Sequence, residues 1–415
     1  MDKEFDWEFY LDYYKDLRKN GIKNKVDAYK HWLAYGRREK RARNKSETLN
    51  RIFVISHNIG GGLSQYVQDL IRLQLNDRFC DEYMIHTNEN VSCSGIKVMN
   101  HANIIKKLYE IENVDNKKVI LHINTLMCVL KTSVEIKRFL LLLEKKKFIR
   151  LIISVHDYYW INVKDPLNLS IDGRDNSSSL FQKMFERAAL VIFPTNCVVD
   201  VYKKKINLTN VKYVVHPHQD IMFDVVPYFP KVNDAWIKIL YLGGRHMSKG
   251  HDVVKALLDK LDTAVSYNFE LYVGGCDESH TLNFKNIKVV NIGIYENKNI
   301  FKIINKIRPH VIIHASVFEE TWSYLLSIFL RTALPIFYND IGALKERISK
   351  LGRNNVSEFD SRIDSIDVIK EKFLVFLEKI ISNGSVDYID VDESYNVIRD
   401  PFYDELYLKN LSPLV

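Results

Sequence analysis

From Arg51 onward, the chain alternates short apolar segments with longer segments whose apolar residues recur at helical spacing. The apolar segments fall into two series: 51–56, 82–86, 119–123, 149–155, 190–193 and 211–215, then 237–242, 269–273, 287–290 and 310–314, with a further buried strand in the apolar stretch that ends near Asp340. Strands that alternate with helices form parallel sheets, because each crossover helix returns the chain to the end of the sheet where the previous strand began. The sequence therefore predicts an α/β protein with two Rossmann-like halves.

The length allows these halves to be separate domains, since 415 residues can form two cores. We predict a small helical module at 1–45, a first domain at 46–228, a second domain at 229–385 and a tail at 386–415. The apolar share of 47% and the aromatic share of 12% are typical of folded globular proteins.

Charge and cysteine content narrow the class of protein. A net charge of +7 suits an anionic ligand or weak attraction to an anionic membrane, but it is too small to indicate a nucleic-acid binder. The five cysteines are far apart and predict neither a disulfide framework nor a metal site, which is typical of a reducing compartment. The longest apolar runs are too short for a membrane span. We predict a cytoplasmic protein, with peripheral membrane contact left open.

The first 45 residues have a different pattern. Two aromatic-rich helix patterns at 5–17 and 27–36 precede a basic run at 37–45, and Gly36 is expected as a helix C-cap. Helices this short bury little surface, so their aromatic side chains must pack on each other or dock on the main body. The basic run is either a contact for membrane headgroups or a glycan, or a solvated linker.

Two glycine-rich loops connect a predicted strand to a predicted helix. The loop 60–62, Gly-Gly-Gly, leads into a helix expected at 63–75, and such a loop can bring backbone N–H groups against a phosphate or a sugar. In the second loop, Arg245 and Lys249 lie four residues apart between glycines, where they can neutralise a diphosphate. The alternative is a pair of ordinary loop cations.

Two further strands end in polar residues. His156 and Asp157 follow the strand 149–155, and Glu319 and Glu320 follow the strand that ends near His314. Ligands bind at the carboxyl ends of parallel strands, so His156 is a candidate for a sugar contact or a proton transfer, and Glu320 for a sugar or ribose contact. The alternatives are a structural histidine bonded to a loop carbonyl, and a solvated helix N-terminus that favours acidic residues.

The sequence His216-Pro217-His218 raises the possibility of a metal site. No partner set with regular ligand spacing accompanies these histidines, so we predict an interdomain connector there and no metal site.

In their order along the chain, these motifs resemble those of retaining-type glycosyltransferases of the GT-B fold, the group that includes mannosyl- and rhamnosyl-like transferases of polysaccharide synthesis. The resemblance covers about residues 50–385 and lies in 60–62, 156–157, 244–250, 320–324 and 340–343. The first segment also resembles, in part, a small aromatic helical module of surface-polysaccharide assembly proteins.

The resemblance implies a GT-B fold, in which two Rossmann-like domains face a cleft. It also implies an enzyme that moves a sugar from a nucleotide-diphospho-sugar to a glycan or lipid-linked acceptor. It implies retention, no metal and no cofactor. Arg245 and Lys249 would hold the diphosphate, His156 would contact the sugar or the acceptor, and Glu320 would bind sugar hydroxyls. The remaining donor-binding residues would be Gly61, Gly62, Gly244, Thr321, Trp322, Ser323, Tyr324 and Ser327.

One position departs from the family pattern, which has a second glutamate eight residues after the first. Ile328 stands there when the count starts at Glu320, and Ser327 when it starts at Glu319. Ser327 or backbone groups would then hold the nucleotide, or donor binding is weak or lost. Two other functions therefore stay open: a catalytically degenerate scaffold or binding subunit, and a nucleotide-sugar epimerase of the same fold. The donor sugar, the base, the acceptor and the oligomeric state are not specified by the sequence.

Overall fold

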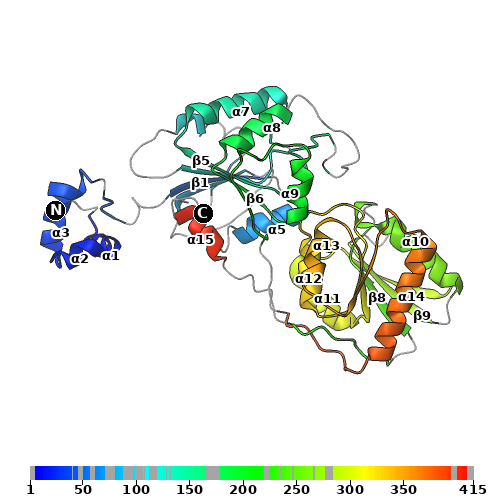
Figure 1. Cartoon of the computed structure of the whole chain (residues 1–415). Helices are drawn as coiled ribbons and strands as arrows, with labels where there is room; N and C mark the ends of the chain where they lie inside the picture. Colours follow the sequence, from blue (N-terminus) through cyan, green and yellow to red (C-terminus); the bar gives the residue numbers. More distant parts are fainter. Residues whose placement is uncertain are drawn as a thin grey trace.

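A computed structural model describes most of the chain (Figure 1). The described residues are 5–39, 41–44, 50–56, 61–70, 80–86, 97–99, 106, 108–111, 119–127, 129–130, 132–164, 166, 178–218, 225–233, 236–244, 247–264, 267–275, 284–393 and 400–408.

The first domain is built on a seven-stranded sheet in the order β3-β2-β1-β4-β5-β6-β7, with every pair parallel. Its strands are β1 (Asn50–Ile55), β2 (Cys80–His86), β3 (Lys97–Met99), β4 (Val119–Ile123), β5 (Ile149–Ser154), β6 (Leu190–Phe193) and β7 (Tyr213–Val215). The order reverses between β1 and β4, as in the Rossmann fold.

The second domain repeats this topology in a six-stranded parallel sheet, β10-β9-β8-β11-β12-β13. Its strands are β8 (Trp236–Tyr241), β9 (Asn268–Gly274), β10 (Ile287–Gly293), β11 (Val311–His314), β12 (Ile336–Asn339) and β13 (Val356–Phe359). The predicted fold class is confirmed. The edge strands β3 and β13 escaped prediction because neither is a continuous apolar run.

Helices cover both faces of each sheet. Those of the first domain are α5 (Gly61–Asp69), α7 (Ser133–Lys145), α8 (Ser178–Arg187) and α9 (Asn196–Lys203). Those of the second are α10 (His251–Ala264), α11 (Ile300–Ile307), α12 (Tyr324–Arg331), α13 (Gly342–Ser349) and α14 (Ile366–Asn383), with short 3₁₀ turns at Met247–Lys249 and Asn297–Asn299. Each sheet accordingly has an apolar core on either side.

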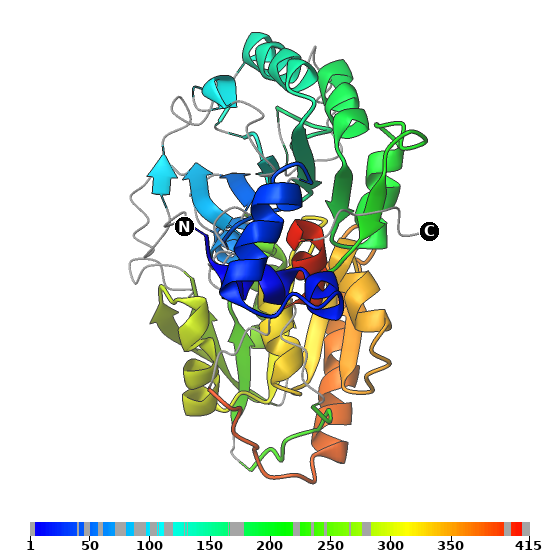
Figure 2. The same ribbon diagram turned by 90° about the vertical axis from the view of Figure 1, so that its left-hand side faces the viewer.

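The end of the chain returns to the first domain, although residues 386–415 were expected to form a tail. Helix α15 (Pro401–Leu408) packs against the first sheet, and in Figure 2 it lies between the two domains. Two buried tyrosines hold it: the Tyr403 hydroxyl is 2.8 Å from that of Tyr66, and the Tyr407 hydroxyl is 2.6 Å from His122 Nδ1. These contacts join residues far apart in sequence, so local patterns did not predict them.

The N-terminal module has a small core of its own. Helices α1 (Trp7–Tyr13), α2 (Lys15–Lys19) and α3 (Lys25–His31), with a π turn at Trp32–Gly36, enclose Phe5, Tyr10, Leu11, Leu17, Ala28 and Trp32. The aromatic side chains thus pack on each other. A Cβ at Gly36 would lie 2.4 Å from the Tyr10 hydroxyl, so this glycine is required for close packing and not, as expected, as a C-cap. The expected domain boundaries stay predictions.

Candidate functional site

A cleft of about 1240 Å³ lies where the two domains meet. The first domain lines it with α5, His156 and His218, and the second with Lys249, the loop 294–298 and the loop 318–325. In each sheet the strand order reverses at the strand that leads to the cleft. In the first domain this strand is β1, which precedes α5, and in the second it is β8, which precedes the turn carrying Lys249. Ligands of such sheets bind at these points.

Lys249 and Glu320 form an ion pair inside the cleft. The Lys249 Nζ lies 2.6 Å from Glu320 Oε1, and the lysine side chain is 41% exposed whereas the glutamate is 8% exposed. Burial alone would raise the pKa of Glu320, but the charge of Lys249 and hydrogen bonds from Lys249 and Ser323 outweigh it and lower the pKa to about 2. Glu320 is therefore ionised at neutral pH and can accept hydrogen bonds but not donate a proton.

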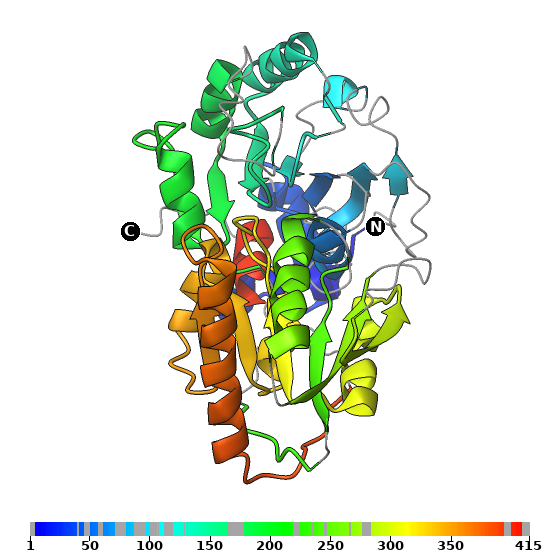
Figure 3. The same ribbon diagram turned by 90° about the vertical axis from the view of Figure 1, so that its right-hand side faces the viewer.

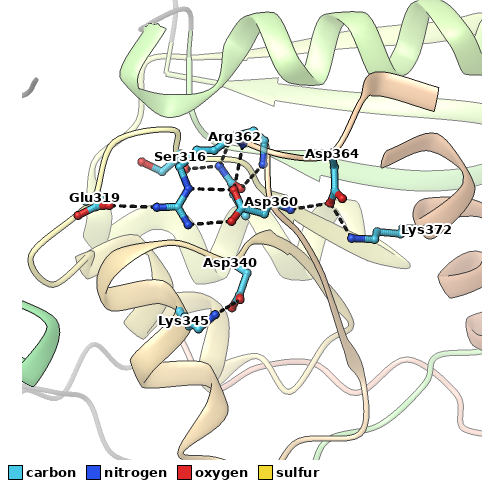
Figure 4. A network of polar contacts seen from close by, with 10 residues as sticks. Ser316, Glu319, Asp340, Lys345, Asp360, Arg362, Asp364 and Lys372 are labelled. Atoms are coloured by element: carbon cyan, nitrogen blue, oxygen red, sulfur yellow. Dashed lines mark hydrogen bonds and ion pairs between the residues drawn. The ribbon is translucent and has the colours of Figure 1, made fainter. Parts of the chain in front are cut away.

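The neighbouring Glu319 points elsewhere. Its carboxylate lies 3.1 Å from Arg362 Nη1, and Arg362 in turn pairs with Asp360 at 2.7 Å (Figure 4). This network belongs to the second domain and occupies Glu319. Of the two adjacent glutamates, only Glu320 lines the cleft.

The loop that carries Glu320 also holds the domains together. The Thr321 hydroxyl donates to the His156 carbonyl at 2.6 Å, and the Thr195 hydroxyl donates to the Thr321 carbonyl at 3.3 Å. A Cβ at Gly62 would come within 2.9 Å of the Tyr324 ring. Glycine at 62 therefore lets this ring of the second domain pack directly on the N-terminus of α5.

A second contact between the domains lies at α9. The Glu346 carboxylate, from α13, accepts hydrogen bonds from the backbone N–H groups of Asn196 and Cys197 at 3.1 and 2.7 Å. Burial opposes ionisation of Glu346, yet its hydrogen bonds with Lys350 and with the start of α9 lower its pKa to about 2. A carboxylate at a helix N-terminus is favoured by the helix dipole. Figure 3 shows α9 beside the second domain.

Ser323 has a positive φ of 67° and caps α12 through a hydrogen bond from the N–H of Leu326. Arg347 supports this strained turn: it donates to the carbonyls of Trp322 and Ser323 at 2.6 and 2.7 Å, and its guanidinium lies 3.7 Å from the centre of the Trp322 ring. Backbone strain of this kind persists only where the surroundings enforce it.

The two candidates for the second family glutamate both point away from the cleft. Ser327 is buried and its hydroxyl accepts a hydrogen bond from Arg347 at 2.7 Å, while Ile328 is completely buried in the core. Neither of these two residues belongs to the lining of the cleft. A ribose contact by Ser327 would require its buried side chain to reach the cleft.

His156 lies at the cleft as expected. Its Nε2 is 3.0 Å from the Asn124 side-chain oxygen, and its ring packs 4.4 Å from that of Tyr66. Asn124 follows β4, so the switch point itself orients the histidine. Because Tyr66 also contacts Tyr403, helix α15 supports the same wall of the cleft.

The other predicted site residues have different positions. Arg245 lies outside the described residues. Gly61 is the first residue of α5. Gly244 has a φ of 60° and packs so closely that a Cβ would meet the Gly275 carbonyl at 2.6 Å.

His218 was expected in a connector, yet it lines the cleft. Its ring lies parallel to that of His156 at 4.2 Å and 21°. Its place just after β7, at the carboxyl end of a parallel strand, is the signal that would have identified it. Arg347 and Glu346 carried no such signal, because their partners lie on other elements.

Because three histidines are buried, we expect the free energy of unfolding to decrease in acid. Burial lowers the pKa of His122 and His218 to about 3 and that of His314 to about 4. The unfolded chain binds these protons near pH 6.5 and the folded chain does not, so the free energy of unfolding falls with pH below 6.5 by up to about 1.4 kcal/mol per unit for each histidine. Asp157, whose pKa burial raises to about 6, acts in the opposite direction but is a single group.

We expect urea midpoints to decrease from pH 6.5 to 4.5. In His314→Gln, which can keep the hydrogen bond to Ser323, the decrease is expected to be shallower. A midpoint that is level or rises over this range would contradict the assignment.

Two Rossmann-like domains facing one cleft define the GT-B fold, and solved structures share it. The chain is similar to sucrose-phosphate synthase from Thermosynechococcus elongatus, with a TM-score of 0.55, 11% identity, and 81% of this chain and 92% of that chain covered. It is similar to a glycosyltransferase from Rickettsia africae, with a TM-score of 0.53 and 16% identity. That match covers 81% of this chain and 91% of the other. It is also similar to Anabaena HepE in complex with UDP-glucose, with a TM-score of 0.51 and 12% identity. That match covers 80% of this chain and 93% of the other.

At these identities the likeness shows the fold. No family model matches the sequence, and no curated protein matches it. Among the described residues, no group of three or more His, Cys, Asp or Glu side chains could hold a metal ion. None of the helices in the described part is long and apolar enough to cross a membrane.

Proposed function

We propose that the protein is a glycosyltransferase that moves a sugar from a nucleotide-diphospho-sugar to a glycan or lipid-linked acceptor, with retention and without a metal. The observation that carries this proposal is the placement of Lys249 and ionised Glu320 in the cleft across from His156 and the N-terminus of α5. This pairs a cation for a diphosphate with a carboxylate for sugar hydroxyls. The solved structure of HepE with UDP-glucose, which has the same fold, supports this class of ligand.

In the proposed reaction, the bond between the anomeric carbon and the diphosphate breaks, and negative charge develops on the diphosphate oxygen. Lys249, together with Arg245, would stabilise that charge where it develops. Retention requires no protein nucleophile if the leaving phosphate accepts the proton of the acceptor on the same face of the sugar. Glu320 would hold sugar hydroxyls, and it is ionised when the donor arrives because Lys249 lowers its pKa to about 2.

The first step in binding is an exchange of partners. Lys249 is bound to Glu320 in this structure, and its partly exposed side chain can turn to a phosphate. The attraction that Glu320 loses would then be replaced by hydrogen bonds from sugar hydroxyls. Lys249 would therefore couple occupancy of the diphosphate site to occupancy of the sugar site.

A specific observation favours a second candidate function, a degenerate binding or scaffold subunit. Isoleucine stands at 328, where the family pattern has its second glutamate, and it is completely buried, so this position offers no carboxylate to a ribose. In the proposed transferase, ribose binding falls instead to the loop 294–298, where Glu296 and Asn297 line the cleft. A nucleotide-sugar epimerase is a third candidate, which only the shared fold supports.

A donor panel tests the proposal. We expect one or more of the UDP-, GDP-, ADP- or TDP-sugars to raise the melting temperature and to be hydrolysed or transferred. A shift without turnover of any donor would favour the binding subunit, and release of an isomerised nucleotide sugar would favour the epimerase. Absence of any shift would contradict both transferase and epimerase.

A further inference from the structure

His218 is a cleft residue to which the proposed function gives no role. It is 2% exposed and packs in a group of aromatic rings from both domains: its ring is 4.2 Å from that of His156, 5.9 Å from that of Trp322 and 6.5 Å from that of Tyr324. All four side chains line the cleft. His218 therefore lies where the sugar-binding loop of the second domain meets the wall of the first.

Three polar atoms in this group lack hydrogen-bond partners among the described residues: both ring nitrogens of His218 and Nε1 of Trp322. The Val155 carbonyl is near enough to influence the pKa of His218, but it does not meet hydrogen-bond geometry. A buried polar group without a partner is unfavourable, so a concentration of such groups at one place requires an explanation. Binding of a ligand there would supply the missing hydrogen bonds.

The charge state of His218 indicates what that ligand is. Burial lowers its pKa to about 3, and the charges of His216 and Arg347 act in the same direction. A neutral imidazole offers one N–H donor and one lone pair, and Trp322 offers one N–H donor. A hydroxyl can accept from the Trp322 N–H and donate to the histidine lone pair, so it can bridge the two side chains. A phosphate oxygen can accept from the N–H groups but leaves the lone pair without a donor.

We propose that His218 and Trp322 together bind a hydroxyl of the sugar being transferred. The proposal rests on the proposed function, because the loop of Glu320 and Trp322 is what places the donor sugar at this wall. It makes His218 a sugar-binding residue that does not contact the diphosphate.

Isothermal titration tests this with the full chain and the matched diphosphate and nucleotide sugar of each base, UDP and UDP-glucose among them. His218→Phe keeps an aromatic ring but removes both nitrogens, and His218→Gln keeps a donor and an acceptor. His216→Phe is the matched control, because His216 lies two residues away and pairs with Asp400 at 2.6 Å. Thermal melting establishes that each variant is folded.

We expect His218→Phe to bind the nucleotide sugar about tenfold more weakly while its affinity for the diphosphate is unchanged. His218→Gln is expected to recover most of the loss, and His216→Phe to bind both ligands normally. Unchanged binding of the nucleotide sugar by His218→Phe would overturn the proposal and leave the proposed function intact, and so would an equal loss for both ligands. If the wild-type chain binds no diphosphate and no nucleotide sugar, the proposed function fails and this proposal with it.

Discussion

Replacing Lys249 with methionine is expected to lower kcat/KM for the donor roughly 100- to 1,000-fold, because a fixed cation is lost where the leaving diphosphate gains charge. Lys249 is well placed for this effect: its ammonium lies in the cleft, 2.6 Å from Glu320. Methionine retains most of the apolar stem, so the change isolates the charge. Steady-state kinetics with the donor identified by the panel measures it.

Lys255→Met is the matched control. Lys255 lies on α10, shortly after Lys249, and pairs with Asp259 at 2.7 Å on the protein surface. We expect normal turnover from this variant, because an exposed pair of this kind contributes little. Equal activity of Lys249→Met and wild type would show that Lys249 is not the diphosphate cation.

The double variant Lys249→Met, Glu320→Gln separates the two consequences of losing the lysine. The single variant leaves a buried carboxylate without its cation, which destabilises the fold. Removing the carboxylate charge as well is expected to restore stability but not turnover. Recovery of turnover in the double variant would mean that Lys249 serves only to neutralise Glu320.

The largest expected loss of stability comes from Gly250→Ala. Gly250 has a φ of 76°, and a Cβ there would lie 1.8 Å from the Ala315 carbonyl oxygen. The left-handed backbone costs an alanine about 1–2 kcal/mol and the steric overlap roughly 1–3 kcal/mol more, so we expect a loss of about 2–5 kcal/mol. Because Gly250 ends the turn that carries Lys249, donor binding is expected to weaken as well.

Gly352→Ala separates backbone strain from the clash. Gly352 has a φ of 57°, but no atom lies within 4 Å of a Cβ built there. We expect it to lose only the 1–2 kcal/mol or so of the backbone term and to bind donor normally. Urea denaturation of both variants measures the difference, and equal losses would refute the predicted clash with Ala315.

Much of the fold followed from local patterns. The strands β4, β6 and β11 are completely buried, so they appear in the sequence as continuous apolar runs. The edge strand β13 is half-exposed and was missed for that reason. Helix α15 was missed because its docking depends on Tyr66 and His122, residues more than 280 positions earlier in the chain.

The sequence by itself determined the two parallel sheets and the loops that carry Lys249, His156 and Glu320, because apolar periodicity and glycine placement are local properties of the chain. Only the tertiary structure decided which side chains reach the cleft. It turned Glu320 to Lys249 and Glu319 to Arg362, buried Ile328 in the core, and brought His218 to the wall of the cleft. The direction of each side chain depends on the strained turn at Ser323 and on contacts between domains, which join residues that no local pattern relates.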